Sequence, residues 1–326
     1  MNKIPTLYND NCLTWMKKQP SEIIDLTVTS PPYDDLRTYN KYSFDFEPIA
    51  NELWRLTKEG GVVVWVVGDG TRRGEITDCN GVKRKAGGET GTSFKQALYF
   101  QQIGFDIHDT MIYNKNSSSY PSGKKSTRYS QIFEYMFVFS KGKPKTVNLI
   151  EDKANKWAGW TNWGKSTKRH ANGELVESTE EKVPIKQFGV RNNIWRIRNG
   201  AGFGQMDDIA YEHPATYPEK LAYDHIRTWS NPGDKVFDPF SGSGTTLIMA
   251  CKYGSDYVGC EMSSEYCEII NKRFDLRCPS DPTGDYKPEY NKEFDREDPP
   301  DDEFIPINPL KKETPAKPAI TFETFL

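Results

Sequence analysis

The sequence predicts a doubly wound, largely parallel α/β sheet, and three observations favour that fold class. Short apolar and β-branched runs alternate along the chain with segments of helical spacing, as in parallel sheets whose strands are joined by helices. A glycine-rich turn at residues 238–246 separates a short apolar run from a longer one. Glu261 ends the next strand-like run about 20 residues later, where nucleotide-binding α/β folds hold ribose hydroxyls.

The pattern predicts each element in chain order. Gly60 and Gly61 are expected to separate a helix from a strand, and residues 71–92 are expected to be a polar loop. The expected strands are 4–8, 23–29, 62–67, 105–113, 132–139, 235–237 and 256–261, and the expected helices are 12–18, 49–56, 93–103, 215–229 and 247–251.

The strand at 23–29 runs directly into Ser30-Pro31-Pro32-Tyr33. The prolines fix two φ angles and carry no N–H, and Ser30 precedes a proline, which favours an extended backbone. The segment is therefore a stiff row containing a hydroxyl, a carbonyl acceptor and an aromatic ring. The alternative interpretation is a strand-terminating Pro-Pro turn with a tyrosine in the core and no functional role.

The turn at 238–246 has the features of a ligand-binding loop. Gly242 and Gly244 lack Cβ atoms, so a ligand can approach the backbone. Ser243, Thr245 and Thr246 are expected to cap the following helix, and Asp238 is expected to accept hydrogen bonds. A glycine turn without a ligand is the alternative. This unit usually opens such folds, so the segments before residue 235 must complete the sheet.

Composition limits the class of protein. The chain of 326 residues suits one large domain with an insertion, or two domains. It has no 18-residue apolar run and no secretory start, so we expect a cytoplasmic protein without a membrane segment. The six cysteines show neither a CxxC pair nor zinc spacing, which predicts reduced thiols and no metal site.

Charge is unevenly distributed around a net value of -3. Residues 114–169 hold 12 Lys and Arg against three acidic residues, which fits a phosphate-binding surface or a solvated face. Residues 276–326 hold 12 acidic residues against seven basic ones, and nine prolines. This tail is predicted to be extended or disordered.

Periodicity is lost between residues 140 and 204. The stretch is basic and contains Trp157, Trp160, Trp163 and Trp195, which suit base stacking or a small satellite core. Residues 159–166 match the P-loop pattern GxxxxGK[ST], but neither an apolar strand precedes them nor a helix follows. We interpret that match as accidental, with a P-loop hydrolase as the rival enzyme class.

Together these motifs resemble the DNA amino-methyltransferases, specifically their circularly permuted β group. Residues 29–33 look like the catalytic motif and residues 238–246 like the cofactor loop. Residues 54–69, 134–141 and 213–221 are similar to further family segments. Asn11 stands where the family usually has an Asp that contacts the adenine of the cofactor, and Phe133 where it often has a His. Binding is expected to survive the first change, and any polar role at Phe133 is in question.

The resemblance implies a Rossmann-like methyltransferase sheet, circularly permuted, with an inserted target-recognition region. The implied parts are a catalytic half (1–140), the insertion (141–204), an S-adenosylmethionine-binding half (205–275) and the acidic Pro-rich tail (276–326). The implied partner is double-stranded DNA in a bacterial or phage-like, nucleoid-associated setting. A companion restriction endonuclease and a homodimer are also compatible with it.

Residue roles follow from the same resemblance. Ser30 and Pro31 would accept hydrogen bonds from the target amine, and Tyr33 would stack on a flipped-out base. A serine at the first catalytic position favours N4 of cytosine. N6 of adenine, an RNA or protein substrate, and a non-catalytic nucleic-acid-binding protein are the alternatives. The implied residues are, for catalysis, Ser30, Pro31, Pro32 and Tyr33; for the cofactor, Asn11, His213, Pro214, Thr216, Asp238, Phe240, Ser241, Gly242, Ser243, Gly244, Thr245, Thr246 and Glu261; and for DNA, Lys124, Lys125, Arg128, Lys165, Arg169, Arg191, Arg196 and Arg198.

Overall fold

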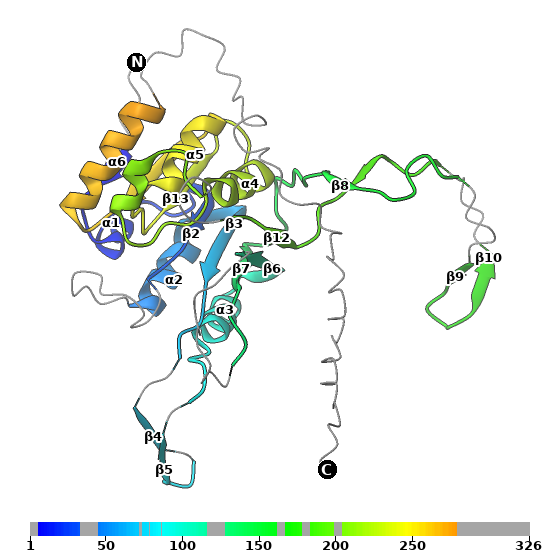
Figure 1. Cartoon of the computed structure of the whole chain (residues 1–326), viewed down its shortest axis with the longest axis horizontal. Coiled ribbons are helices and arrows are strands. Elements are labelled where there is room, and N and C mark those ends of the chain that lie inside the picture. The colour runs from blue at the N-terminus through cyan, green and yellow to red at the C-terminus, as the bar shows by residue number, and fades with distance from the viewer. Residues whose placement is uncertain are drawn as a thin grey trace, which may run out of the picture.

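A computed structural model describes residues 6–32, 45–71, 74–77, 79–85, 87–115, 128–161, 167–177, 183–198 and 204–278. An eight-stranded sheet of order β1-β14-β13-β2-β3-β7-β6-β12 is the centre of this part of the chain (Figure 1). Its strands are β1 (Thr6–Tyr8), β2 (Ile24–Thr29), β3 (Thr57–Val67), β6 (Asp106–Asn114), β7 (Phe133–Ser140), β12 (Ile194–Arg196), β13 (Lys235–Asp238) and β14 (Asp256–Cys260).

The sheet is parallel except at one strand. β7 pairs antiparallel with β3 and with β6, and every other neighbouring pair of the sheet is parallel. The expected doubly wound, largely parallel sheet is therefore confirmed. β13, from late in the chain, lies between β14 and the early strand β2. The carboxyl ends of β2 and β13 thus meet at one edge of the sheet.

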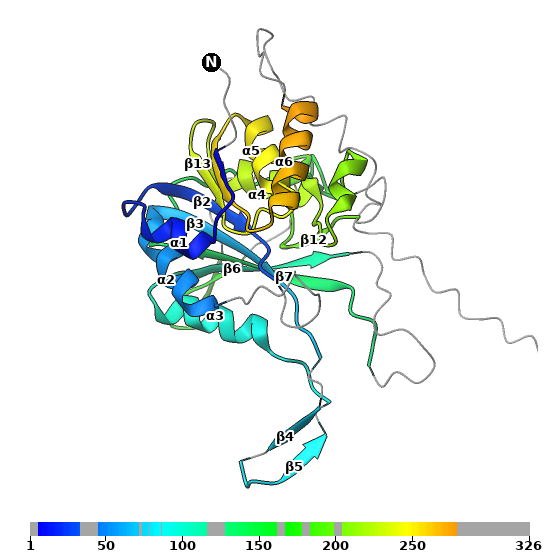
Figure 2. The same ribbon diagram turned by 90° about the vertical axis from the view of Figure 1, so that its left-hand side faces the viewer.

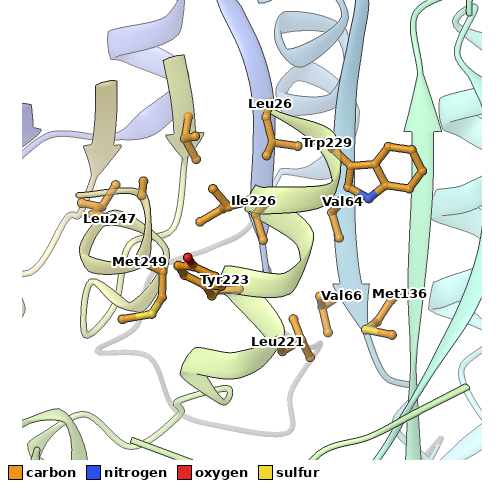
Figure 3. Close-up of a cluster of buried hydrophobic side chains, with 14 of the residues drawn as sticks. Leu26, Val64, Val66, Met136, Leu221, Tyr223, Ile226, Trp229, Leu247 and Met249 are labelled. Carbon is orange, nitrogen blue, oxygen red and sulfur yellow. The ribbon is translucent and has the colours of Figure 1, made fainter. Parts of the chain in front are cut away.

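Helices cover both faces of the sheet (Figure 2). Alternate residues of one strand serve opposite cores: Val64 and Val66 pack with α4 and α5, whereas Val63 and Trp65 pack with α1, α2 and α3. Figure 3 shows α4 laid across β2 and β3. The helices are α1 (Cys12–Lys17), α2 (Phe46–Leu56), α3 (Thr92–Gln102), the 3-10 helix η2 (Asp208–Glu212), α4 (Glu219–Trp229), α5 (Thr245–Tyr253) and α6 (Ser264–Arg277).

Two expected boundaries are wrong for identifiable reasons. β3 begins at Thr57 and runs through the Gly60–Gly61 pair that was expected to precede it. Gly60 has φ +72 there, and its N–H donates to the carbonyl of Lys141. The helix expected from residue 215 begins only at Glu219. Pro218 is its N-cap in an extended conformation. A residue that precedes a proline disfavours the helical conformation, so the helix does not begin before Pro218.

Residues 71–92 are not wholly irregular, because they contain an antiparallel hairpin of β4 (Glu75–Thr77) and β5 (Lys83–Lys85). Its three-residue strands are too short to show a period in the sequence. Between 141 and 204, two small pairs form: β8 (Lys153–Ala154) with β11 (Phe188–Gly189), and β9 (Thr167–Arg169) with β10 (Leu175–Glu177). Both lie away from the main sheet (Figure 1). β12, from the end of this stretch, joins the sheet beside β6.

None of the helices in the described residues is both long and apolar enough to span a membrane. No cluster of three or more His, Cys, Asp or Glu side chains that could hold a metal ion occurs among these residues.

Candidate functional site

A cavity of about 360 Å³ opens at the carboxyl edge of the sheet. Residues far apart in the chain line it, including Ser30 to Pro32 after β2 and the loop between β13 and α5. The expected site residues that line it are Asn11, Ser30, Pro31, Pro32, His213, Thr216, Phe240, Ser241, Gly242, Ser243, Thr245 and Glu261. Pro214, Asp238, Gly244 and Thr246 do not line it, and Tyr33 lies outside the described residues.

The loop after β13 needs glycine at two positions. Gly242 has φ +51 and Gly244 has φ +79, a region that favours glycine. A Cβ on Gly242 would come within 3.1 Å of the His213 ring, so the loop and the His213 segment are in close approach. The Gly242 N–H donates to the Glu261 carboxylate at 2.9 Å, and the Ser241 N–H donates to the Cys260 carbonyl at 3.0 Å. These contacts fix the loop against the end of β14.

Side-chain capping of α5 was expected and does not occur. The N-cap is Gly244, and no side chain caps the helix. Thr246 Oγ1 instead donates to the Val28 carbonyl at 2.9 Å, and Thr245 Oγ1 donates to Gln205 at 3.4 Å. These hydroxyls link the helix start to β2 and to the chain ahead of η2.

Asp238 lies behind the wall of the cavity. Its side chain is almost fully buried and accepts hydrogen bonds from Thr29 Oγ1 at 2.6 Å and from the Phe240 N–H at 3.1 Å. Burial raises the pKa of Asp238 to about 6, although the Thr29 hydrogen bond opposes this shift. Asp238 therefore joins the cofactor-like loop to the strand that leads into Ser30.

Glu261 and Asn11 both line the cavity. The Glu261 carboxylate also accepts from the Ser263 N–H at 2.9 Å. Burial raises its pKa, and hydrogen bonds from the backbone N–H groups of Ser263 and Gly242 oppose that. Asn11 Oδ1 caps α1 by accepting from the N–H groups of Leu13 and Thr14.

His213 and Thr216 form the facing wall, ahead of α4. The His213 ring lies edge-on to Tyr266, with centroids 4.3 Å apart, and the Ala215 N–H donates to His213 Nδ1 at 3.1 Å. The segment therefore covers the glycine loop with an aromatic pair.

Sequence reasoning missed the wall built from β6 and β7. Tyr113, Lys115 and Glu134 line the cavity, and Lys115 Nζ lies 2.8 Å from Glu134 Oε1. In the sequence, Glu134 stands out only as the start of a family-like segment. The signal that could have found the wall is the pairing of two strands, which brings Tyr113 opposite Glu134.

A second missed feature is the buried guanidinium of Arg273 in α6. It is fully buried and pairs with Asp207 at 3.0 Å and with Glu219 at 2.8 Å. It also donates to the carbonyl of Ser243 at 2.6 Å. Arg273 thus holds the glycine loop to the segment before α4. A lone arginine in a helix gave no sequence signal of burial.

The expected DNA-contacting residues are scattered. Arg191 is 13% exposed and pairs with Asp152 and, at 2.6 Å, with Asp224. Its guanidinium is committed to these carboxylates, so the expected phosphate role is not supported. Arg128 pairs with Glu89 at 3.4 Å. Arg169 and Arg198 are exposed, Arg196 is half-buried, and Lys124, Lys125 and Lys165 lie outside the described residues.

The P-loop-like stretch gains no support from its surroundings. Residues 162–166 lie outside the described part of the chain, and the strand before them is the exposed, two-residue β8. A P-loop requires a buried strand in that position.

Comparison with known proteins gives consistent matches. A family model, N6_N4_Mtase, described as DNA methylase, matches residues 24–272. The chain is 57% identical over 250 residues to "Orphan methyltransferase M.BamHII" of Bacillus amyloliquefaciens, covering 77% of this chain and 88% of that protein. It is 27% identical over 287 residues to "DNA adenine methyltransferase YhdJ" of Escherichia coli K12, covering 84% of each.

Solved structures share the fold. "PvuII DNA methyltransferase (cytosine-N4-specific)" aligns with a TM-score of 0.61 at 19% identity, covering 90% of this chain and 92% of that one. A putative DNA modification methylase of Thermus thermophilus, complexed with S-adenosyl-L-methionine, aligns with a TM-score of 0.53 at 22% identity, covering 85% of this chain and 96% of that one.

Proposed function

Because this chain belongs to the N6_N4_Mtase family of DNA methylases, we propose that it methylates the exocyclic N4 of a cytosine flipped out of duplex DNA, with S-adenosylmethionine as methyl donor. The observation that carries the proposal is one cavity lined both by Ser30, Pro31 and Pro32 and by the glycine loop. The two motifs lie more than 200 positions apart in the chain. In this chain the catalytic motif precedes the cofactor loop, as in the permuted β group.

The cavity fits the cofactor by its donor set. Gly242 leaves backbone open where a Cβ would fill the space before His213. Glu261 offers carboxylate oxygens suited to ribose hydroxyls, and Asn11 offers an amide. We assign Asn11, His213, Thr216, Phe240 to Ser243, Thr245 and Glu261 to direct contact, with Pro214, Asp238, Gly244 and Thr246 as supports behind them. When bound, S-adenosylmethionine supplies a methyl group on a positively charged sulfur.

The catalytic row acts on the amine of the base. That nitrogen is a poor nucleophile, because its lone pair is delocalised into the ring. Ser30 Oγ and the Pro31 carbonyl would accept hydrogen bonds from the two N–H groups of the amine. These hydrogen bonds would favour a tetrahedral nitrogen with a localised lone pair. The same two acceptors stabilise the positive charge that develops on nitrogen, as preorganised dipoles do. Tyr33 would stack on the base, and no covalent enzyme intermediate is required.

The remaining partners follow from the resemblance and the charge distribution. Flipping the base costs a few kcal/mol, which backbone contacts must offset. We assign phosphate contacts to Arg128, Arg169, Arg196 and Arg198, and to Lys124, Lys125 and Lys165. A cytoplasmic location, a companion restriction endonuclease and a homodimer are carried by the resemblance alone.

Adenine N6 is the second candidate target, since the name of one relative describes an adenine methyltransferase. Mass spectrometry of nucleosides decides between the two. Unmethylated bacterial genomic DNA is incubated with the purified protein and methyl-labelled S-adenosylmethionine. Label on N4-methylcytosine is the expected result. Label on N6-methyladenine would overturn the base assignment, and no label on any base would overturn the proposed activity.

A further inference from the structure

The β6–β7 wall of the cavity, Tyr113, Lys115 and Glu134, presents three polar side chains that the proposed reaction does not yet use. Tyr113 pairs opposite Glu134 across the two antiparallel strands, so both side chains lie on one face of the sheet. Lys115 lies two residues further, on that same face. The backbone N–H of Lys115 donates to the Ile132 carbonyl at 2.7 Å, so the hydrogen bonding between the two strands continues beyond the end of β6.

Ser30 reaches the cavity from the same side of the sheet. Tyr113 belongs to the core that contains Val28, and Ser30 follows Val28 by two residues. All four side chains also line the one cavity. A ligand held against Ser30 and Pro31 therefore faces the β6–β7 wall.

The ammonium of Lys115 is oriented by Glu134 and has more N–H donors than that pair uses. Its side chain is 21% exposed and that of Glu134 is 15% exposed, so the pair at 2.8 Å is partly shielded from water. An ammonium has three N–H donors, and Glu134 Oε1 accepts one. Glu134 fixes the direction of the ammonium, and the remaining N–H groups have no other acceptor among the described residues.

Tyr113 is a second donor with no acceptor of its own. The residue is 2% exposed, and its hydroxyl has no hydrogen-bond partner among the described residues. Burial and the nearby Glu134 raise the pKa of Tyr113, so the hydroxyl keeps its proton. A buried polar group without a partner is unfavourable, and an acceptor on a ligand would satisfy it.

We propose that Lys115, oriented by Glu134, and Tyr113 form a donor wall that reads the acceptor atoms of the flipped base. The inference rests on the proposed function and adds the residues that select the base. Beside its target amine, cytosine presents the acceptors N3 and O2. Adenine presents N1 and then a C–H. Two donors match cytosine, whereas adenine would leave one of them, the Tyr113 hydroxyl, unpaired.

The first test uses the wild-type protein, so folding of a variant is not at issue. The recognition sequence is mapped by sequencing DNA that the protein has methylated, and two duplexes carrying it are made. One has cytosine at the target position and the other has 3-deazacytosine, which keeps the N4 amine and O2 but lacks the N3 acceptor. We expect kcat/KM to fall about tenfold or more on the analogue, because a donor is left unpaired. Equal kcat/KM on the two duplexes would overturn the donor wall.

The second test separates the two donors. On cytosine duplexes, Lys115→Met and Tyr113→Phe are each expected to lower kcat/KM about tenfold or more. Tyr113→Phe is also expected to reduce the ratio of kcat/KM on the duplex with cytosine at the target position to kcat/KM on a duplex with adenine there. Tyr223→Phe in α4 and Lys58→Met, whose lysine pairs with Asp25, are matched controls outside the cavity. Calorimetric affinity for S-adenosylmethionine should match that of wild type in both cavity variants.

The outcomes distinguish the two proposals. No methyl label from the wild-type protein on any DNA would remove the proposed function itself. A wild-type protein that labels adenine rather than cytosine would overturn the donor wall and leave DNA methylation standing. A wild-type protein that labels cytosine, with Tyr113→Phe and Lys115→Met equal to their controls in rate and base preference, would overturn the donor wall alone.

Discussion

Thr29 Oγ1 donates a hydrogen bond of 2.6 Å to Oδ1 of Asp238, which lies 209 positions later in the chain. Both side chains are buried. Thr29 ends β2, just before the catalytic row, and Asp238 ends β13, just before the glycine loop. Together with the β2–β13 pairing and the Thr246 hydrogen bond to the Val28 carbonyl, this contact fixes the position of the two motifs relative to each other.

Replacing Thr29 by Val should therefore destabilise the protein and weaken cofactor binding. Asp238 would lose its shortest hydrogen bond, which typically costs about 1–3 kcal/mol when the other partner stays buried. Urea unfolding and calorimetry with S-adenosylmethionine measure the two effects. Thr27→Val is the matched control, because the buried Thr27 hydroxyl on the same strand has no partner among the described residues. Equal losses in the two variants would contradict the role of the Thr29 contact.

Asp238 should make stability depend on pH in an unusual direction. Its folded pKa of about 6 exceeds the ordinary value of 3.8. The folded state therefore holds a proton that the unfolded state has already lost between those values. The contribution of Asp238 to the free energy of unfolding is most favourable below pH 3.8 and declines as pH rises to about 6, by about 3 kcal/mol. Urea unfolding of wild type and Asp238→Asn from about pH 4 to 7 should show this difference, and a constant gap would refute it.

Arg273→Met should be strongly destabilising. It would remove one of the two arginines that pair with the buried carboxylates of Asp207 and Glu219, leaving Arg277, and breaking a buried ion pair typically costs about 3–5 kcal/mol. Arg273→Lys should recover only part of the loss, because an ammonium cannot reproduce the planar fork of contacts. Lys272→Met, at the exposed neighbouring position, serves as the control. A melting temperature for Arg273→Met within a degree of that control would show the network to be dispensable.

Gly242→Ala should impair cofactor binding beyond its effect on folding. The positive φ of Gly242 should cost about 1–2 kcal/mol of stability with any side chain. The new Cβ would also approach the His213 ring at 3.1 Å inside the cavity. Gly233 also has a positive φ, of +88, and a Cβ there would meet nothing within 4 Å, so Gly233→Ala isolates the backbone effect. Calorimetry should show weaker binding for Gly242→Ala alone; equal affinities would remove the glycine from the cofactor site.

Ser30→Ala should separate chemistry from cofactor binding. Without its hydroxyl, one of the two proposed acceptors of the amine is lost, so the methyl transfer rate should fall about 100-fold or more. Affinity for S-adenosylmethionine should remain within about twofold, since the proposed role of the serine is toward the base. Single-turnover transfer of labelled methyl groups measures the rate. An unchanged rate would remove Ser30 from the chemistry.

The sequence predicted those parts of the site whose signal is local. The glycine loop at 238–246 and the row from Ser30 to Pro32 carry their conformations in glycine and proline, and both line the cavity. Lys115 and Glu134 form a pair only through the register of two strands, which single residues do not encode. The burial of Arg273 depends on carboxylates 54 and 66 positions away. The ion pairs of Arg191 with Asp152 and Asp224 likewise cannot be predicted from a lone arginine in the sequence.

The placement of β13 between β2 and β14 has a consequence for biosynthesis. Val236 of β13 pairs with Leu26 of β2, so one edge of β2 has no neighbour until more than 200 further residues have been translated. At about 5–20 residues per second, the ribosome needs tens of seconds or less to supply them. During that interval the apolar strand β2 has an unpaired edge, and the cavity lacks the residues of the glycine loop. A truncated translation product would therefore lack methyl-transfer activity and would be a natural client for chaperones.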